Sequence, residues 1–387
     1  MISKIFLPRS LKWAIHACKL NTKEKIIVTG VNLESGGTLS VFNDALFVFA
    51  DKFSDKYDIY VFCSKRNRTR YPGLNYLEFS WSKKSYVIRI LLEKIFFFQF
   101  SKNVKIKLWL SMHDITPRVL ADNVVTYVHN PSPFYTLKLQ DIYFSPTFAL
   151  FVLLYKYVYK WGIDRNNCIV VQQSWIKKKF DEIAPEVNKI IAKPKVDFKQ
   201  VLFSSNFKKK YDRKFFFYPT LPRIFKRIED FLRVAEFFNR IGCVEFYFII
   251  TISGKENNYS RWLFKRFNYL PNVVWLGHVD RGEVFNLYRE AHCLIFTSHL
   301  ETWGLPLTEF SMTNKPIIVP DLPYVYETLS RYPKFAVYDA RNIIKLFELT
   351  LKIAYNDKIE YCDATGQKSC DVTVDGWSDL ITRLIEK

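Results

Sequence analysis

The sequence predicts an α/β protein with two domains, each built on a parallel sheet covered by helices. The chain has 387 residues, enough for two domains that each bury their own core. In each half of the chain, short runs typical of strands alternate with segments of helical periodicity, which is typical of parallel sheets with helices on both faces. Between about Asn188 and Lys214 the alternation stops and lysines and a proline dominate. We therefore expect an N-terminal domain over 1–200 and a C-terminal domain over 201–370.

The elements of the first half follow from apolar runs bounded by polar residues. Strands and helices are expected, in order, at Lys25–Val31, Leu39–Phe53 (helix), Asp58–Cys63, Tyr86–Phe100 (helix), Lys105–Met112, Val124–His129, Thr147–Tyr159 (helix) and Cys168–Gln172. The first strand and first helix are joined by a glycine loop that contains Gly36 and Gly37. Such a loop can bring its backbone close to a ligand. It lacks the full Gly-x-Gly-x-x-Gly pattern, however, and a plain tight turn would look the same.

The second half repeats the alternation. Its clearest elements are expected at Phe215–Tyr218, Glu229–Arg240 (helix), Val244–Ile252, His292–Ser298 and Phe335–Tyr338, and the final segment 371–387 contains an amphipathic helix over Trp377–Ile385. In parallel sheets ligands sit beyond the carboxyl ends of the strands. The loops after Val31, Tyr218 and Ser298 are therefore candidates for one crevice.

The segment after His292–Ser298 is the strongest candidate for a nucleotide-sugar site. Glu301 follows the strand, Gly304 begins a turn, and a helix over Leu307–Thr313 carries Glu309 in its first turn. The N–H groups at this helix start could hold a phosphate, and a first-turn carboxylate could accept ribose hydroxyls. The residues at the turn and helix start are Leu305, Pro306, Leu307 and Thr308. Taken singly, each glutamate could instead be a helix-dipole partner or a solvated charge.

A second candidate is the cationic loop after the strand Phe215–Tyr218. Arg223 and Lys226 could meet a diphosphate there and stabilise the charge that grows on it as a glycosidic bond breaks. A solvated basic loop is the alternative reading, because charge runs often have no further role.

These residues resemble the group 1 glycosyltransferases, a retaining family with the GT-B fold. The resemblance rests on SHLETWGLPLTEFSMTNKPIIVPDLPYVYETL, and two further runs, VTGVNLESGGTLSVFNDAL and YVHNPSPFY, resemble the branch that builds bacterial capsule and O-antigen polysaccharides. The resemblance implies two Rossmann-like domains facing a central cleft. It also implies a nucleoside diphosphate sugar as donor, a lipid-linked glycan as acceptor, and a C-terminal helix that packs back on the first domain.

The resemblance also implies roles for residues of the first domain. His129 matches the family histidine that faces the transferred sugar, whereas Asn130 stands where the family more often has an acid. His113 and Asp114 form a second pair that could face the acceptor, although a lone histidine such as His113 is as often structural. With Glu301 and Lys226, His129 completes the expected catalytic set.

Composition narrows the partners and the compartment. The formal net charge is +19, which favours polyanions such as phosphorylated substrates or an anionic membrane surface, and no nucleic-acid module is visible. There is no Asp-x-Asp and no cluster at metal-ligand spacing, so we expect no metal and no cofactor. Scattered cysteines without a signal peptide indicate the cytoplasm. Two aromatic segments, 86–100 and 144–161, could lie on the inner face of the cytoplasmic membrane or be ordinary core helices.

The sequence thus predicts a retaining, metal-independent glycosyltransferase that is peripheral to the membrane. A GT-B scaffold that binds without turnover in a polysaccharide assembly complex is the alternative from another class. A glycan hydrolase would need two carboxylates about a glycosidic bond and no nucleotide.

Overall fold

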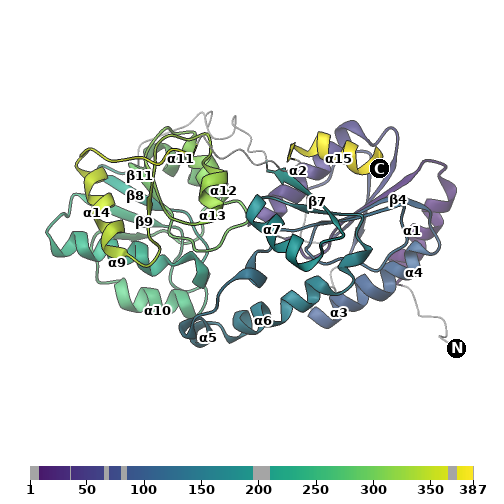
Figure 1. Cartoon of the computed structure of the whole chain (residues 1–387), viewed down its shortest axis with the longest axis horizontal. Coiled ribbons are helices and arrows are strands. Elements are labelled where there is room, and N and C mark those ends of the chain that lie inside the picture. Colours follow the sequence, from purple (N-terminus) through teal and green to yellow (C-terminus); the bar gives the residue numbers. More distant parts are fainter. Residues whose placement is uncertain are drawn as a thin grey trace. The chain divides into compact units, whose positions relative to one another are not determined.

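The computed structural model describes residues 8–34, 36–64, 69–79, 85–194, 210–364 and 373–386. The chain forms two compact units (Figure 1). The first comprises Met1–Phe134, Leu154–Lys195 and Cys370–Lys387, and the second comprises Tyr135–Leu153 and Val196–Ser369. Each unit contains one parallel sheet with helices packed on it, which confirms the predicted α/β class.

The sheet of the first unit has the strand order β14-β7-β6-β5-β4-β1-β2-β3, and its neighbours pair in parallel. The strands are β1 (Lys25–Gly30), β2 (Asp58–Cys63), β3 (Leu74–Glu78), β4 (Ile106–Ser111), β5 (Asn123–Tyr127), β6 (Cys168–Val171), β7 (Asn188–Lys193) and β14 (Thr373–Asp375). The chain winds outwards in one direction from β1 through β2 and in the other from β4. The carboxyl ends of β1 and β4 therefore flank the topological switch point, where ligands of such sheets bind.

Helices cover both faces of this sheet. They are α1 (Arg9–Leu20), α2 (Gly36–Lys52), α3 (Tyr86–Leu91), a π-helical turn (Leu92–Phe96), α4 (Phe97–Ser101), α6 (Pro146–Lys160), α7 (Ser174–Ile183) and α15 (Trp377–Glu386), with short 3₁₀ turns at Ser132–Phe134 and Ile163–Arg165. One core cluster joins α2 and α15 to the sheet, and the other joins α1 and α4 to it. At the end of β1, a Cβ on Gly30 would lie 2.7 Å from the Phe42 ring, so only glycine allows α2 to pack so closely.

The segment predicted as one helix over Tyr86–Phe100 is helical but is interrupted by the π turn. Phe97 and Phe100 are fully buried, and their rings pack against Phe62 at centroid distances of 5.3 and 5.4 Å. Of the two aromatic segments considered for a membrane surface, this one is therefore a core helix. The Phe97 and Phe100 side chains are part of the core of the first unit.

The second unit has the strand order β10-β9-β8-β11-β12-β13, again with parallel neighbours. Its strands are β8 (Lys214–Tyr218), β9 (Phe246–Ile250), β10 (Val273–Trp275), β11 (Cys293–Ile295), β12 (Ile317–Pro320) and β13 (Phe335–Tyr338). Its helices are α5 (Leu139–Phe144), α9 (Ile228–Arg240), α10 (Asn258–Phe267), α11 (Arg281–Glu290), α12 (Leu305–Ser311), α13 (Pro323–Thr328) and α14 (Ile343–Ala354), with a 3₁₀ turn at Ile224–Lys226. The switch point lies between β8 and β11.

Residues 135–153 belong to the second unit, although the predicted division at residue 200 placed them in the first domain. Aromatic packing explains this: the Phe144 ring lies 4.9 Å from that of Trp262, and the Phe148 ring lies 5.8 Å from that of Phe225. The boundary between the units therefore falls within α6.

The last described segment returns to the first unit. Strand β14 pairs with β7, Trp377 stacks on Tyr127 at 5.3 Å, and the Asn123 side chain donates to the carbonyl of Leu384 at 2.6 Å. Within the described ranges, no helix combines the length and the apolar character that crossing a bilayer requires.

Candidate functional site

The loops after β8 and β11 bring Lys226 and Glu301 together at the switch point of the second unit. The Lys226 ammonium donates directly to Oε1 of Glu301, although 75 positions separate the two residues. Their side chains are 16% and 13% exposed, so the pair is largely shielded yet still reachable. Two residues that the sequence analysis placed in one site are thus in contact.

The backbone around Lys226 is fixed by hydrogen bonds from neighbouring strands. The Lys226 carbonyl accepts from the Tyr218 hydroxyl at 2.8 Å and from the Thr297 hydroxyl at 3.0 Å. The His299 N–H donates to the carbonyl of Phe225 at 2.7 Å, which joins the Lys226 loop to the Glu301 loop. The ammonium of Lys226 also lies 5.3 Å from the centre of the Phe296 ring. This arrangement presents one cation at a defined position.

Two arginines near Lys226, Arg227 and Arg223, have different environments. Arg227 adopts φ +50° and pairs with Glu229 at 2.8 Å and Asp230 at 3.0 Å, so it serves the internal structure of the unit. Arg223 is exposed and precedes the 3₁₀ turn that carries Lys226. Its predicted contact with a diphosphate stays a prediction.

The helix after Glu301 starts earlier than predicted. Gly304 adopts φ +83°, a left-handed conformation that favours glycine, and α12 runs over Leu305–Ser311 instead of starting at Leu307. The Leu307 N–H donates to the Gly304 carbonyl at 2.9 Å and so forms the first turn of the helix. Pro306 fits this turn because an N–H group at that position would have no partner within the helix. Glu309 therefore lies in the second turn, and the prediction of a first-turn acid was wrong. The side chain of Thr308 accepts from the Trp303 indole at 2.9 Å.

Glu309 is held by two partners that the sequence analysis missed. Its Oε1 accepts from Arg281 at 3.0 Å and its Oε2 accepts from the Tyr288 hydroxyl at 3.1 Å. Burial raises the pKa of Glu309 above its usual value, and Arg281 and Tyr288 only partly offset this effect. Both partners come from α11, whose sequence carried no signal beyond ordinary amphipathic spacing. A carboxylate offers about four acceptor positions, so two of them stay available for hydroxyls.

In the first unit, His113 lies in the interior. It is fully buried, its Nε2 lies 3.0 Å from Oε1 of Glu93, and its Nδ1 lies 3.1 Å from the carbonyl of Thr29. Arg89 donates to the same Glu93 at 3.0 Å and to the Tyr155 hydroxyl at 3.2 Å. Burial alone would raise the pKa of Glu93, but His113 and Arg89 lower it below its usual value. This is the environment of a structural histidine and not of a side chain that faces an acceptor.

Asp114 connects the loops after β4 and β5. It adopts φ +74°, and its Oδ1 accepts from the backbone N–H groups of His129 at 2.6 Å and Asn130 at 2.9 Å. Burial raises the pKa of Asp114, although these two N–H groups and Arg89 act in the opposite direction. Asp114 therefore positions His129 and Asn130 through their main chain.

His129 is buried with its ring 4.6 Å from that of Tyr127. Burial, together with the nearby His113, lowers the pKa of His129 to about 3, so the ring is neutral at pH 7. Its Nε2 has no hydrogen-bond partner among the described residues. A neutral imidazole can exchange one hydrogen bond with a ligand but cannot supply a positive charge.

The glycine loop lies at the carboxyl end of β1, beside the loop after β4. Gly36 adopts φ +75° and begins α2, and a Cβ there would meet nothing within 4 Å. Gly37 follows in the first turn of the same helix. The backbone is therefore open to an approaching group at this position.

His299 was also missed by the sequence analysis. Its Nε2 is buried without a hydrogen-bond partner in the described ranges, and burial lowers its pKa to about 4, helped by the charges of Arg227 and Lys138.

Across the part of the chain that the structure describes, no three histidine, cysteine or carboxylate side chains are grouped closely enough to hold a metal ion.

The segment that carries this site is similar to known proteins. Residues 199–368 match the model of "Glycosyl transferases group 1", a range that contains Lys226, Glu301 and Glu309. The chain is 25% identical over 136 residues to the processive diacylglycerol alpha-glucosyltransferase of Acholeplasma laidlawii, an alignment that covers 35% of this chain and 39% of that protein. It is 26% identical over 229 residues to the O-antigen chain mannosyltransferase RfbU of Salmonella typhimurium, which covers 58% and 59% of the two chains.

The chain therefore spans only part of these curated relatives. Among solved structures, it is similar to WaaG, a glycosyltransferase involved in lipopolysaccharide biosynthesis, with a TM-score of 0.62 and 10% identity over 85% of this chain and 90% of that one. That likeness concerns the fold alone. With the two parallel sheets, it shows that the chain has the GT-B fold, and the segment 199–368 is similar to the group 1 glycosyltransferases.

Proposed function

We propose that the protein transfers a sugar, with retention of configuration, from a nucleoside diphosphate sugar to a lipid-linked glycan of a bacterial surface polysaccharide. The observation that carries the proposal is the Lys226–Glu301 pair at the switch point of the second unit, inside the segment that matches the family. An O-antigen chain mannosyltransferase among the relatives supports the choice of acceptor class.

Lys226 would meet the diphosphate of the donor. A fixed cation aimed at the charge that develops on the leaving group stabilises the transition state more than the ground state. Tyr218 and Thr297 hold the Lys226 backbone, so this charge needs little reorganisation. The start of α12 would contact the same phosphates through N–H groups that stay free, which excludes Pro306 and also Leu307, whose N–H donates to the Gly304 carbonyl.

Glu309 and Glu301 would take the two ends of the donor. The two free acceptor positions of Glu309 suit adjacent ribose hydroxyls, while Arg281 and Tyr288 keep its carboxylate oriented. Glu301 would accept hydroxyls of the transferred sugar once the donor has drawn Lys226 towards its phosphates. His129 and the loop of Gly36 and Gly37 stay predicted contacts of the sugar. No metal is needed in this arrangement, because Lys226 and the backbone supply the positive charge.

We also propose that the protein works at the inner face of the cytoplasmic membrane and contacts it through α6. The inward side of this helix is buried, whereas its outward side exposes an apolar stripe at spacings of three and four residues, each member more than half exposed: Leu150, Leu153, Leu154, Tyr157 and Trp161. Lys156 and Lys160 are exposed beside the stripe. An apolar face flanked by cations suits the interface of an anionic bilayer.

The test of the proposed reaction is a thermal-shift screen of the full chain with UDP, GDP, dTDP, ADP and CMP, followed by turnover with sugars of the nucleotide that binds. One nucleotide should raise the melting temperature, since a ligand that binds only the folded state stabilises it. Sugar transfer with that nucleotide supports the enzyme. Nucleotide binding without transfer or donor hydrolysis would favour the non-catalytic GT-B scaffold instead.

A further inference from the structure

The first unit has a basic hollow at the amino-terminal ends of its strands β4, β5 and β6. Its walls include the residues that immediately precede three neighbouring strands: Lys105 before β4, Asp122 before β5 and Asn167 before β6. Ile106, the first residue of β4, also lines it. Candidate residues such as Asp114 and His129 follow the carboxyl ends of these strands. The hollow, about 920 Å³ in volume, is therefore distinct from the donor and acceptor sites proposed above.

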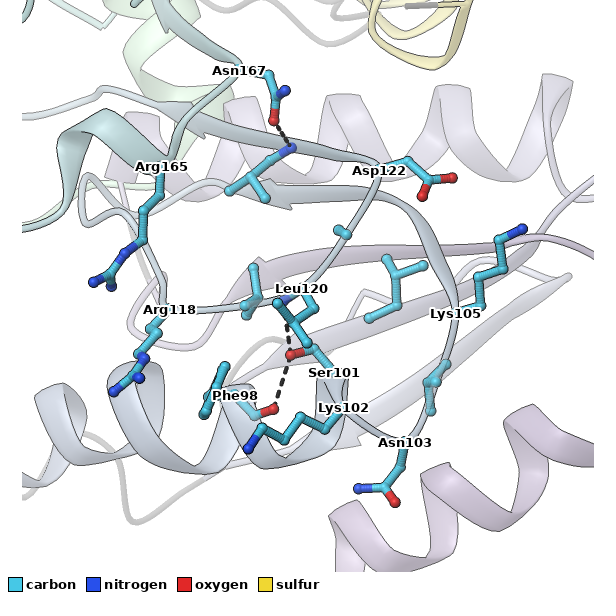
Figure 2. A pocket seen from close by; sticks show the side chains of 15 residues that line it. Phe98, Ser101, Lys102, Asn103, Lys105, Arg118, Leu120, Asp122, Arg165 and Asn167 are labelled. Carbon is cyan, nitrogen blue, oxygen red and sulfur yellow. Dashed lines mark hydrogen bonds between the residues drawn. The ribbon is translucent and has the colours of Figure 1, made fainter.

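Four cations line this hollow, and Figure 2 shows Lys105 on the side of Asp122 and the others on the opposite side: Lys102, Lys105, Arg118 and Arg165. All four are exposed, and Asp122 is the single carboxylate among the lining residues. Arg118 and Lys102 both lie over the Phe98 ring, 4.3 and 4.5 Å from its centre. Figure 2 shows the two cations on either side of the ring, so each is held at the surface by one electron-rich ring face.

The walls of the hollow are tied in place. Ser101 accepts from the Leu120 N–H at 2.9 Å, and Asn167 accepts from the Val124 N–H at 2.9 Å. The Arg118 N–H donates to the carbonyl of Glu93 at 3.1 Å, which fixes the start of the Arg118 side chain on the first unit's core. The cations therefore stand on a formed surface, so binding an anion costs little ordering of the chain.

The field of these cations extends to a buried neighbour. Lys94 donates to the carbonyls of Thr116 at 2.7 Å and Trp161 at 2.9 Å. Burial lowers its pKa to about 8, and the positive charge of Arg165 contributes to that shift. Lys94 precedes Phe98 by one helical turn, and the charges of Glu93 and Asp164 partly offset the lowering of its pKa.

From this excess of cations over carboxylates in its lining we infer that the basic hollow is a second anion site of the protein, separate from the sugar-transfer site, and that it binds a phosphate group. Arginine pairs with phosphate through two parallel hydrogen bonds, and Arg118 and Arg165 lie on the same side of the hollow (Figure 2). Its lining also includes the apolar side chains Val104, Ile106 and Val119. The phosphate could belong to a phospholipid headgroup or to a soluble phosphate compound, since the recognising chemistry is the same.

The test compares two double variants of the full chain that each remove two charges. Arg118→Gln with Arg165→Gln changes the hollow, and Arg261→Gln with Arg331→Gln removes two exposed arginines of the second unit. Calorimetry with inorganic pyrophosphate, in a Lys226→Ala background that weakens the donor site, measures the free anion. Sedimentation with vesicles of phosphatidylglycerol in phosphatidylcholine measures the headgroup.

The hollow variant should bind at least one of these probes about tenfold more weakly or worse, because charge-assisted contacts to two arginines are lost, and the control variant should match its parent. Loss of pyrophosphate binding alone would assign the site to soluble phosphate compounds, and loss of vesicle binding alone would assign it to lipid. The inference is overturned if the parent binds neither probe, or if the two double variants bind both probes equally well. Donor turnover is measured separately, so a failed sugar-transfer proposal would leave this result readable.

Discussion

The contact between Lys226 and Glu301 yields a quantitative prediction for a pair of substitutions. Lys226→Met removes the ammonium and keeps most of the stem, and Glu301→Gln removes the negative charge and keeps the shape. Because each side chain is less than one-fifth exposed, either change leaves the other charge largely shielded without its partner. Each should lower the free energy of unfolding by ~1 to 3 kcal/mol. The double variant should lose less than the sum, with a coupling of at least ~0.5 kcal/mol.

Turnover should separate the catalytic role of Lys226 from this structural one. If the ammonium stabilises the leaving diphosphate, Lys226→Met should lower kcat by ~10²- to 10³-fold. Urea unfolding and initial rates of the four proteins measure both quantities. The Lys210–Glu283 pair, 2.8 Å apart but with its lysine 52% exposed, is a matched control, and Lys210→Met should cost less than ~1 kcal/mol. A Lys226→Met protein with unchanged unfolding and near-normal turnover would refute both the pair and its assigned role.

Four further predictions follow from the structure. The pKa of His129 is about 3 in the folded protein, below its usual 6.5, so its contribution to stability is full above pH 6.5. This contribution is lost as the pH falls towards 3, by at most ~1.4 kcal/mol per pH unit. In urea titrations His129→Gln should lose stability less steeply with falling pH, and a loss identical to that of the parent would contradict this. Glu309→Gln should weaken nucleotide binding by ~1 to 3 kcal/mol in calorimetry, and unchanged affinity would remove Glu309 from the donor site. Activity should persist in EDTA, whereas an absolute need for Mg²⁺ or Mn²⁺ would overturn the metal-independent mechanism. Leu154→Ser with Tyr157→Ser should reduce sedimentation with anionic vesicles at low salt, and binding by the parent that is indifferent to salt and lipid charge would count against membrane contact.

Strands with a strong local signal were predictable from the sequence. Asp58–Cys63 and Phe335–Tyr338 were observed with their predicted bounds, because each is an apolar, aromatic-rich run between polar residues. Strand β14 was missed, since three residues show no periodicity and the strand exists only through its pairing with β7. The π turn was missed as well, because its side chains fit an ordinary helix pattern.

The candidate site was predictable only where its signal is local. The spacing of Glu301, Gly304 and Glu309 was visible in one short segment, and the matched family range contains it. The contacts of Glu309 with Arg281 and Tyr288 were not visible, because they depend on how α11 packs beside α12. The interior position of His113 likewise depends on Glu93, to which the sequence analysis assigned no role.

The return of the last segment to the first unit has a consequence for how the protein is made. Val374, Leu380 and Ile381 are part of the core cluster that holds β1, β2 and β4, so that core lacks one side until the ribosome has released residues beyond 372. The residues of the second unit, which end at Ser369, have all been synthesised by then. The unit that begins the chain is thus the last to be completed during translation. Changes to the segment 373–386 would consequently disturb the sheet of the first unit and affect the second unit least.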